Sequence, residues 1–186
     1  MRKIINSTYI TLDGAVENPQ LWPSLGTAAE AVSFNIQNEL LQACDALVMG
    51  RRTYDAFAAV WPTRSGDSLS DRINAMPKYV ASSTLHDPAW TNTTVIRDLV
   101  GELTKLKQQP GKAILQYGLG PVSFTLMEHG LLDEIRLWVY PLILGSKGPR
   151  VPHFLECLPA RLHLVESQSL PNGVTILSFS LPGEKP

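Results

Sequence analysis

The organisation of this chain is set by Asp45-Ala46-Leu47-Val48-Met49-Gly50-Arg51-Arg52-Thr53-Tyr54-Asp55-Ala56-Phe57, where a short apolar run ends at a glycine and two arginines. We interpret this stretch as a buried strand that leads directly into a helix. Gly50 would let a ligand approach the backbone, and the free N–H groups of a helix start attract anions. Arg51 and Arg52 add permanent positive charge, and Thr53 adds a hydroxyl. The pattern predicts a site for a phosphorylated ligand, with a tight turn and a solvated arginine face as the alternative.

The length and composition indicate a single domain over residues 1–186. A chain of 186 residues that is 44% hydrophobic and 18% charged has the composition of an ordinary globular protein. The formal net charge is -1 and no Lys/Arg-rich block occurs, so nothing directs the chain toward nucleic acid. The N-terminus has no apolar leader and no apolar run approaches 18 residues, so we expect a cytoplasmic protein without membrane contact.

The cysteines and histidines give no reason to expect a metal. Cys44 and Cys157 are far apart in the sequence, and the four histidines have no ligand spacing among themselves or with the cysteines. We expect both cysteines to be small packed residues. The motifs of serine hydrolases and nucleotide triphosphatases do not occur either.

Strand and helix patterns alternate along most of the chain. A first strand is expected over 3–12, and the next helix is expected to begin with a capping box of Thr27 and Glu30 and to end near Ala43. Ala31, Phe34, Leu41 and Ala43 recur at roughly helical spacing and are expected on its apolar face. Later strands are expected over 45–49, 78–84, 93–96, 113–117 and 133–144, with helices after Asp98 and from Pro121.

The remaining segments carry turn signals. Residues 62–77 read as a loop with at most one helical turn, and Pro141 predicts a break, an edge or a bulge. Residues 162–181 predict a hairpin that turns at Asn172-Gly173. A slip in its second strand near Leu177 indicates a bulge or burial on both faces. Together the elements predict an α/β fold: a mixed, mostly parallel sheet flanked by helices, with a C-terminal antiparallel hairpin.

Ligands of such sheets bind at the carboxyl ends of the strands, and two ends besides Gly50 carry suitable residues. Ser82, Ser83 and Thr84 would bond a ribose phosphate or cap their strand. Gly118-Leu119-Gly120 would approach a pyrophosphate in front of the next helix, or form a plain turn. Neither motif by itself distinguishes phosphate binding from the structural alternative.

Two carboxylates and a tryptophan are further candidates. Glu30 lies one helical turn before Phe34, so acid and ring share a face that could hold a flat nitrogen heterocycle. The alternative is that Glu30 serves only the capping box. Asp13 follows the first strand in a turn with Gly14, which is a common place for a purely structural aspartate. Trp22 lies in a loop between two prolines and is the tryptophan best placed to line a pocket.

Six motifs in order resemble the dihydrofolate-reductase-like family that includes the C-terminal reductase domain of the bifunctional riboflavin-biosynthesis deaminase-reductase. The resemblance is greatest to the small stand-alone bacterial members and covers nearly the whole chain. The motifs are Thr11-Leu12-Asp13-Gly14, Met49-Gly50-Arg51-Arg52-Thr53-Tyr54, Asn74-Ala75-Met76-Pro77-Lys78-Tyr79-Val80, Gly118-x-Gly120, Gly130-Leu131-Leu132-Asp133-Glu134 and Pro141-Leu142-Ile143-Leu144-Gly145.

The resemblance implies a dihydrofolate-reductase-like three-layer fold with NADPH across the three strand ends. It places phosphate on Gly50 to Thr53 and the adenosine 2′-phosphate near Ser82 and Ser83. It places the pyrophosphate on Gly118, Leu119, Gly120, Pro121 and Val122. The chain departs from the family at Leu119, where a small residue is usual, and over Gly148 to Phe154, where the run after Gly145 is more broken.

The chemistry that the resemblance implies is hydride transfer from NADPH to a C=N or C=O carbon of a small pyrimidine- or pterin-like substrate. The order Trp22, Glu30, Phe34 fits the family's proton donor and substrate pocket, and Asp13 is the competing donor. The alternative function is a nucleotide- or pterin-binding protein on the same scaffold that has lost catalysis. A homodimer is expected in either case, because Arg136 to Leu144 and Val174 to Leu181 offer apolar strands for an interface.

Overall fold

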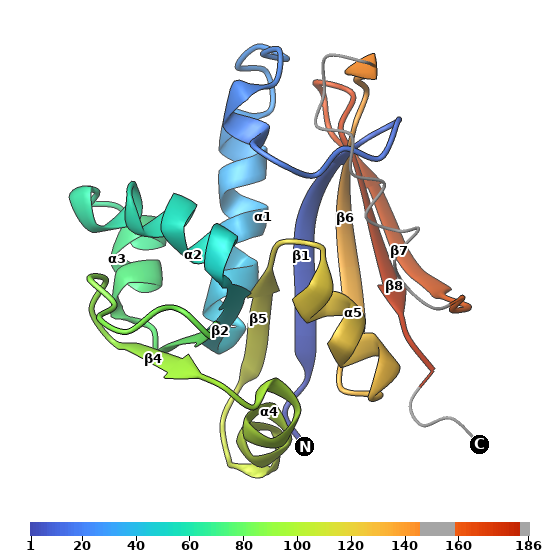
Figure 1. The fold of residues 1–186 in the computed structure, drawn as a ribbon. Helices are drawn as coiled ribbons and strands as arrows, with labels where there is room; N and C mark the ends of the chain where they lie inside the picture. The colour runs from blue at the N-terminus through green and yellow to red at the C-terminus, as the bar shows by residue number, and fades with distance from the viewer. Residues whose placement is uncertain (146–158, 183–186) are drawn as a thin grey trace.

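A computed structural model gives the fold of the chain and describes residues 1–145 and 159–182. Its strands are β1 (Ile4–Thr11), β2 (Cys44–Gly50), β3 (Lys78–Ala81), β4 (Thr93–Ile96), β5 (Ala113–Tyr117), β6 (Glu134–Tyr140), β7 (His163–Ser169) and β8 (Thr175–Ser180). Its helices are α1 (Glu30–Gln42), α2 (Arg51–Ala58), α3 (Ser68–Ala75), α4 (Leu99–Gln108) and α5 (Pro121–Glu128), with 3-10 turns η1 (Pro19–Leu21) and η2 (Trp61–Thr63). Figure 1 shows these helices around one central sheet.

The strands form one sheet in the order β4-β3-β2-β5-β1-β6-β8-β7. All pairs of neighbouring strands among β1 to β6 are parallel. Strand β8 lies between β6 and β7 and is antiparallel to both. The prediction of a mostly parallel sheet with an antiparallel C-terminal pair is confirmed. Because six strands run the same way, their carboxyl ends and the loops that follow them lie along one edge.

Alternation along β2 shows why helices cover both faces of the sheet. Leu47 and Met49 pack with residues of α1 and α3, whereas Ala46 and Val48 pack with residues of α4 and α5. Successive strand residues point to opposite faces, so each set must meet its own helix layer. The result is the predicted three-layer arrangement (Figure 1).

Several predicted boundaries are confirmed. Strand β2 passes directly into α2, and Asp98 caps α4 by accepting the Gly101 N–H at 2.9 Å. Strand β6 stops at Tyr140, just before the proline that was expected to break it. The terminal hairpin turns at Gly173, whose φ of 85° suits a residue without a Cβ.

The predicted capping box is wrong. Helix α1 begins at Glu30, its N-cap is Ala29, and no side chain caps it; Thr27 contributes only its carbonyl, which accepts the Glu30 N–H at 3.0 Å. Of the predicted apolar face only Leu41 is buried, next to Leu40; Ala31 and Ala43 are exposed and Phe34 is 36% exposed, so that part of the prediction is wrong. The first half of α1 extends past the end of β2 (Figure 1) and contacts the sheet there through Ile36, which packs near Trp138, and through Gln37, which donates to the Tyr9 hydroxyl.

The segment expected to be a loop over 62–77 contains the eight-residue helix α3. Asp67 caps it by accepting the N–H groups of Leu69 and Ser70 at 3.0 and 2.9 Å, and the helix buries Leu69 and Ile73. An aspartate cap followed by apolar residues four apart is a helix signal that the surrounding glycine and serine residues obscure.

Two strand details also differ from prediction. Strand β3 ends at Ala81, because Ser82 Oγ accepts the N–H groups of Thr84 and Leu85 and forms a turn. Strand β8 pairs with β6 without interruption, and the irregularity lies instead in β7, between Leu164 and Glu166. Strand β8 is covered to some extent on both faces, which is the alternative that its apolar pattern allowed.

Other expectations are tested only in part. Cys44 is buried, whereas Cys157 and the run from Gly148 to Phe154 lie outside the described residues. Across the parts of the chain that the structure describes, no three or more His, Cys, Asp or Glu side chains gather as a metal site would require. Over the same residues, no helix has both the length and the apolar character needed to cross a bilayer.

Candidate functional site

Two helices begin at the carboxyl edge of the sheet with glycine at the N-cap. Gly50 precedes α2 and Gly120 precedes α5, and neither helix start has a side chain that caps it. The first backbone N–H groups of a helix have no partner within the helix. At α5 the first position is Pro121, which has no N–H to satisfy. Both helix starts therefore offer backbone donors and a positive dipole end to an anion.

The two helix starts lie against each other. A Cβ built on Gly118 would stand 2.5 Å from Thr53 Oγ1, and one built on Gly50 would stand 3.2 Å from Val122 Cγ2. Side chains at these positions would fill the space between the strand ends of β2 and β5. The close packing of the Thr53 and Val122 side chains therefore favours glycine at both positions that the sequence singled out.

Gly118→Ala is expected to lower the free energy of unfolding by more than the roughly 1–2 kcal/mol that a left-handed conformation costs an alanine. Gly118 has a φ of +84° and, in addition, its new methyl would meet the Thr53 hydroxyl. Gly66→Ala is the matched control, because Gly66 has a φ of +88° and open space around its Cβ position. Urea unfolding of both variants measures the difference, and equal losses would show that the contact with Thr53 costs nothing.

Within residues 1–145 and 159–182, the two arginines of the α2 start make exposed ion pairs. Arg51 Nε donates to both carboxylate oxygens of Asp55 at 2.8 Å, one turn along the helix. Arg52 Nη1 lies 3.3 Å from Glu17 Oε1, and the Arg52 side chain is 91% exposed. Exposed pairs of this kind contribute about 0–1 kcal/mol, so both guanidinium groups can turn to a phosphate at little cost.

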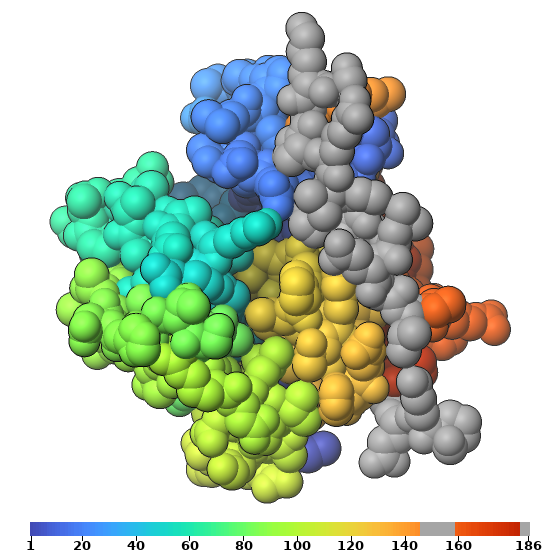
Figure 2. Space-filling model, viewed as in Figure 1, coloured from blue at the N-terminus to red at the C-terminus, as the bar shows by residue number. Residues whose placement is uncertain are grey.

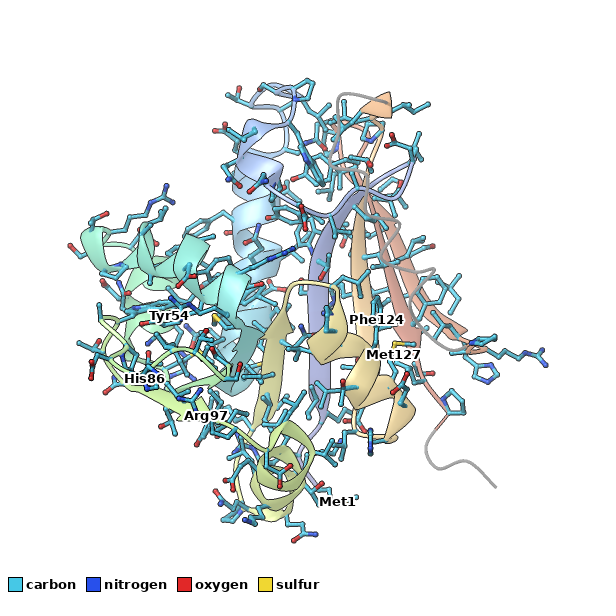
Figure 3. The ribbon with its side chains drawn as sticks, viewed as in Figure 1. Met1, Tyr54, His86, Arg97, Phe124 and Met127 are labelled. Atoms are coloured by element: carbon cyan, nitrogen blue, oxygen red, sulfur yellow. The ribbon has the colours of Figure 1, made fainter. Side chains whose placement is uncertain are left out.

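A third strand end, after β3, is held by a residue that sequence reasoning missed. Arg97 donates to the carbonyl oxygens of Ser82 and Leu85, the latter at 2.7 Å, so it fixes the turn that carries Ser83. Ser83 is exposed, whereas Ser82 uses its hydroxyl within the turn. Figure 3 shows Arg97 with His86 and Tyr54 in the part of the molecule built by α2, β3 and β4. Its position could have indicated this role, because Arg97 is the first residue after β4 and therefore lies at the carboxyl end of a parallel strand.

A cavity of about 450 Å³ brings together three residues that the sequence proposed for the substrate, namely Trp22, Glu30 and Phe34. A volume of this size suits a small-molecule ligand. Glu30 is not engaged in a capping box, so the structural alternative for this carboxylate is removed. The other lining residues are Pro19, Gln20, Pro23, Ser24, Leu25, Gly26, Ser33, Gln37, Leu69, Tyr140 and Asn172.

An aromatic row supports one wall of this cavity. The ring centroids of Trp22 and Tyr140 are 5.2 Å apart, and those of Tyr140 and Tyr9 are also 5.2 Å apart. Gln37 Nε2 donates to the Tyr9 hydroxyl at 2.5 Å. Burial raises the pKa of both tyrosines above the ordinary range, so their hydroxyls stay protonated at neutral pH. Sequence reasoning missed Tyr140, although its place at the carboxyl end of β6 was a usable signal.

The loop between β1 and α1 links the cavity to the α2 start. Trp22 Nε1 donates to the Glu17 carbonyl at 3.0 Å, and the Glu17 carboxylate pairs with Arg52. Figure 2 shows the N-terminal segment, α2 and α5 on one face of the molecule. Glu17 therefore connects a residue of the cavity wall with the start of α2.

Asp13 does not line the cavity and makes structural hydrogen bonds. Its Oδ1 accepts the Thr11 hydroxyl at 2.6 Å, and its Oδ2 accepts the N–H groups of Leu144 and Gly145 at 3.1 and 2.8 Å. These bonds, the one from Thr11 above all, lower the pKa of the Asp13 carboxyl. Glu30 lines the cavity and Asp13 does not, so the geometry favours Glu30 over Asp13 as the proton donor.

The lowered pKa of Asp13 gives a pH-dependent prediction. A folded-state pKa below the unfolded value of about 3.9 contributes stability above that pH, which is lost as the pH falls through the folded pKa. Asp13→Asn is therefore expected to remove part of the acid-induced loss of stability below about pH 4. Thermal melting of both proteins between pH 2 and 7 measures this. Parallel curves at all pH values would contradict the assignment.

Comparison with known proteins identifies the class to which this fold and site belong. Residues 2–176 match the family model of the RibD C-terminal domain, which covers nearly the whole chain. The chain therefore belongs to the RibD C-terminal domain family, as its sequence motifs predicted. It is 25% identical over 186 residues to the uncharacterized protein YyaP of Bacillus subtilis (strain 168), and the match covers 98% of this chain and 96% of the relative.

Solved structures show the same fold. A putative riboflavin biosynthesis protein from Shewanella sp. PV-4 superposes with a TM-score of 0.69 at 19% identity, covering 97% of this chain and 99% of that one. The diaminohydroxyphosphoribosylaminopyrimidine deaminase/5-amino-6-(5-phosphoribosylamino)uracil reductase from Thermotoga maritima gives a TM-score of 0.65 at 13% identity, covering 97% of this chain and 57% of that one. The chain thus spans about half of the latter, bifunctional protein.

Proposed function

We propose that this protein is an NADPH-dependent reductase that transfers a hydride to a C=N or C=O group of a small pyrimidine- or pterin-like substrate. The observation that carries the proposal is the meeting of two helix starts that have glycine at the N-cap, together with a cavity lined by a carboxylate and aromatic rings that Glu17 connects to the start of α2. The family and the reductase in the name of the Thermotoga maritima protein support it.

In this proposal the cofactor's phosphates lie at the carboxyl edge of the sheet. The donors are the backbone N–H groups at Gly50 to Thr53 and at Gly118 to Val122, together with Arg51 and Arg52. Ser83, on the turn that Arg97 holds, faces the adenosine 2′-phosphate. NADPH supplies the hydride when it is bound.

The substrate occupies the cavity. The Glu30 carboxylate accepts hydrogen bonds from ring N–H groups and relays a proton, taken up from water, to the atom next to the reduced carbon. Phe34 and Trp22 pack against the faces of a flat ring, and the carboxamide of Gln37 lies on the same wall as Tyr140. These residues suit a planar nitrogen heterocycle, because acid, amide and ring groups recognise its edge and its faces.

The first test is a titration of the purified protein with NADPH and NADH, followed by tryptophan fluorescence. Micromolar binding of NADPH, tighter than that of NADH, is the expected result. A panel of pyrimidines, pterins and small carbonyl compounds is then tested for consumption of NADPH. Absence of saturable binding would refute the reductase, and binding without turnover of any panel member would favour the non-catalytic binding protein.

We also propose that the protein is a homodimer. Strands β6, β8 and β7 form one end of the sheet, and β7 exposes Leu164 and Val165, which are 58% and 66% exposed. Burial of such residues against a second copy would remove apolar surface from water. Sedimentation at micromolar concentration is expected to give the mass of a dimer, and a monomer would contradict the proposal.

A further inference from the structure

The carbonyl oxygen of Gly118, at the carboxyl end of β5, accepts hydrogen bonds from three buried side chains. Asn6 Nδ2 donates at 2.8 Å, Gln116 Nε2 at 2.6 Å and Ser123 Oγ at 3.0 Å. These three side chains are 0%, 1% and 0% exposed. A peptide carbonyl has two lone pairs, so three donors saturate it.

The three side chains also bind one another. Asn6 Nδ2 donates to Gln116 Oε1, and Ser123 Oγ lies 3.1 Å from the same oxygen. Thr8 Oγ1 completes the group by donating to Asn6 Oδ1 at 3.0 Å. Asn6 and Gln116 are directly paired between β1 and β5, and Ser123 comes from the first turn of α5. Two strands and a helix are therefore joined at one backbone oxygen.

We infer that Asn6, Gln116 and Ser123 are positioning residues that preorganise the Gly118-Leu119-Gly120 turn for the pyrophosphate of the cofactor. In a trans peptide the C=O and the following N–H point in opposite directions. A Gly118 carbonyl held toward the buried network therefore turns the Leu119 N–H away from it, toward the outer side of the turn. The network thus fixes a donor for an anion before the anion arrives.

The cost of this arrangement supports a role in binding. Asn6 and Gln116 occupy the same face of the sheet as the apolar residues Ile4, Val48 and Ile114. Apolar side chains would cover that face without the need to satisfy buried polar atoms, and an incompletely bonded network there would be costly. A fully bonded group aimed at one carbonyl is what orientation of the turn requires.

This inference rests on the proposed function, and its test uses two ligands. NADPH contains the pyrophosphate, whereas adenosine 2′-monophosphate carries only the adenosine 2′-phosphate. Gln116→Met replaces the donor by an apolar chain of similar length, and Ser123→Ala removes a single hydroxyl. We expect Gln116→Met to raise the dissociation constant of NADPH about tenfold and Ser123→Ala about threefold, which are the factors that correspond to the loss of a strong and of a weak hydrogen bond. Binding of adenosine 2′-monophosphate should change less than twofold.

Ser178→Ala is the matched control, because Ser178 is a serine with 3% exposure on β8, outside the network. Calorimetric titration measures both ligands, and thermal melting shows that each variant is folded. Unchanged NADPH binding in Ser123→Ala and Gln116→Met, or an equal loss for both ligands, would overturn the inference while leaving the reductase intact. Absence of NADPH binding by the wild-type protein would instead refute the proposed function, and the inference with it.

Discussion

Glu30→Gln is expected to lower the reductive turnover of a substrate found in the panel by at least about a hundredfold, because positioned acids and bases contribute about 10²–10⁴ in rate. The glutamine keeps the size of the side chain and its place in the wall of the cavity. It loses the negative charge that recognises ring N–H groups and the ability to deliver a proton. The dissociation constant of NADPH should remain unchanged, because Glu30 lines the cavity and lies outside the starts of α2 and α5, where the cofactor's phosphates are proposed to bind.

The matched control for this prediction is Glu39→Gln. Glu39 is an exposed carboxylate near the other end of the same helix, α1. Its replacement by glutamine therefore removes the same charge from the same helix as Glu30→Gln does. Steady-state kinetics with the substrate, together with NADPH titrations of both variants, separate loss of turnover from loss of cofactor. A Glu30→Gln protein with wild-type turnover would remove this residue from the mechanism.

Arg51→Ala and Arg52→Ala are each expected to raise the dissociation constant of NADPH about tenfold. A hydrogen bond to a charged group contributes about 1.5–3 kcal/mol, and each 1.4 kcal/mol corresponds to a factor of ten in affinity. The ion pairs that the two arginines make now are exposed and worth little, so their loss should hardly affect stability. The affinity of the wild-type protein should also fall as salt is added.

Arg64→Ala provides the comparison for the arginine variants. The Arg64 guanidinium carbon lies 5.4 Å from the centroid of the Trp61 ring, away from the starts of α2 and α5. The Arg64→Ala substitution therefore removes the same positive charge at a different place. Fluorescence titrations with NADPH and NADH identify the phosphate that each arginine contacts. A selective loss for NADPH indicates the 2′-phosphate, and an equal loss for both indicates the pyrophosphate. If Arg64→Ala weakened binding as much as the other two, a general charge effect would replace the specific site.

Local patterns predicted the elements that carry the cofactor candidates. The apolar run up to Met49 and the glycine after it fixed β2 and the start of α2, and Pro121 fixed the start of α5. These signals are local, since they depend on side-chain alternation, on the missing Cβ of glycine and on the fixed φ of proline. The approach of a ligand to Gly50 and to the Gly118-Leu119-Gly120 turn stays a prediction, since the structure shows only the side chains of Thr53 and Val122 packed against these glycines.

Long-range contacts settled the roles that local patterns left open. The sequence alone could not separate a capping Glu30 from a Glu30 in a cavity, because the start of α1 depends on the loop before it. The sequence also left Asp13 as an alternative proton donor to Glu30. The hydrogen bonds from Leu144 and Gly145 that give Asp13 a structural role join residues more than 130 positions apart, so no local pattern reveals them. Arg97 and Tyr140 were missed because their neighbours come from other strands and loops.

The sequence by itself determined the order of strands and helices except for α3, the glycines at the strand ends and the family to which the chain belongs. Only the tertiary structure decided that Gln116 and Asn6 meet at one backbone carbonyl, and that the Trp22 loop joins the cavity to α2. The physical reason is that backbone preferences act over a few residues. Sites at the edge of a parallel sheet are assembled instead from chain segments that only the crossover connections bring together.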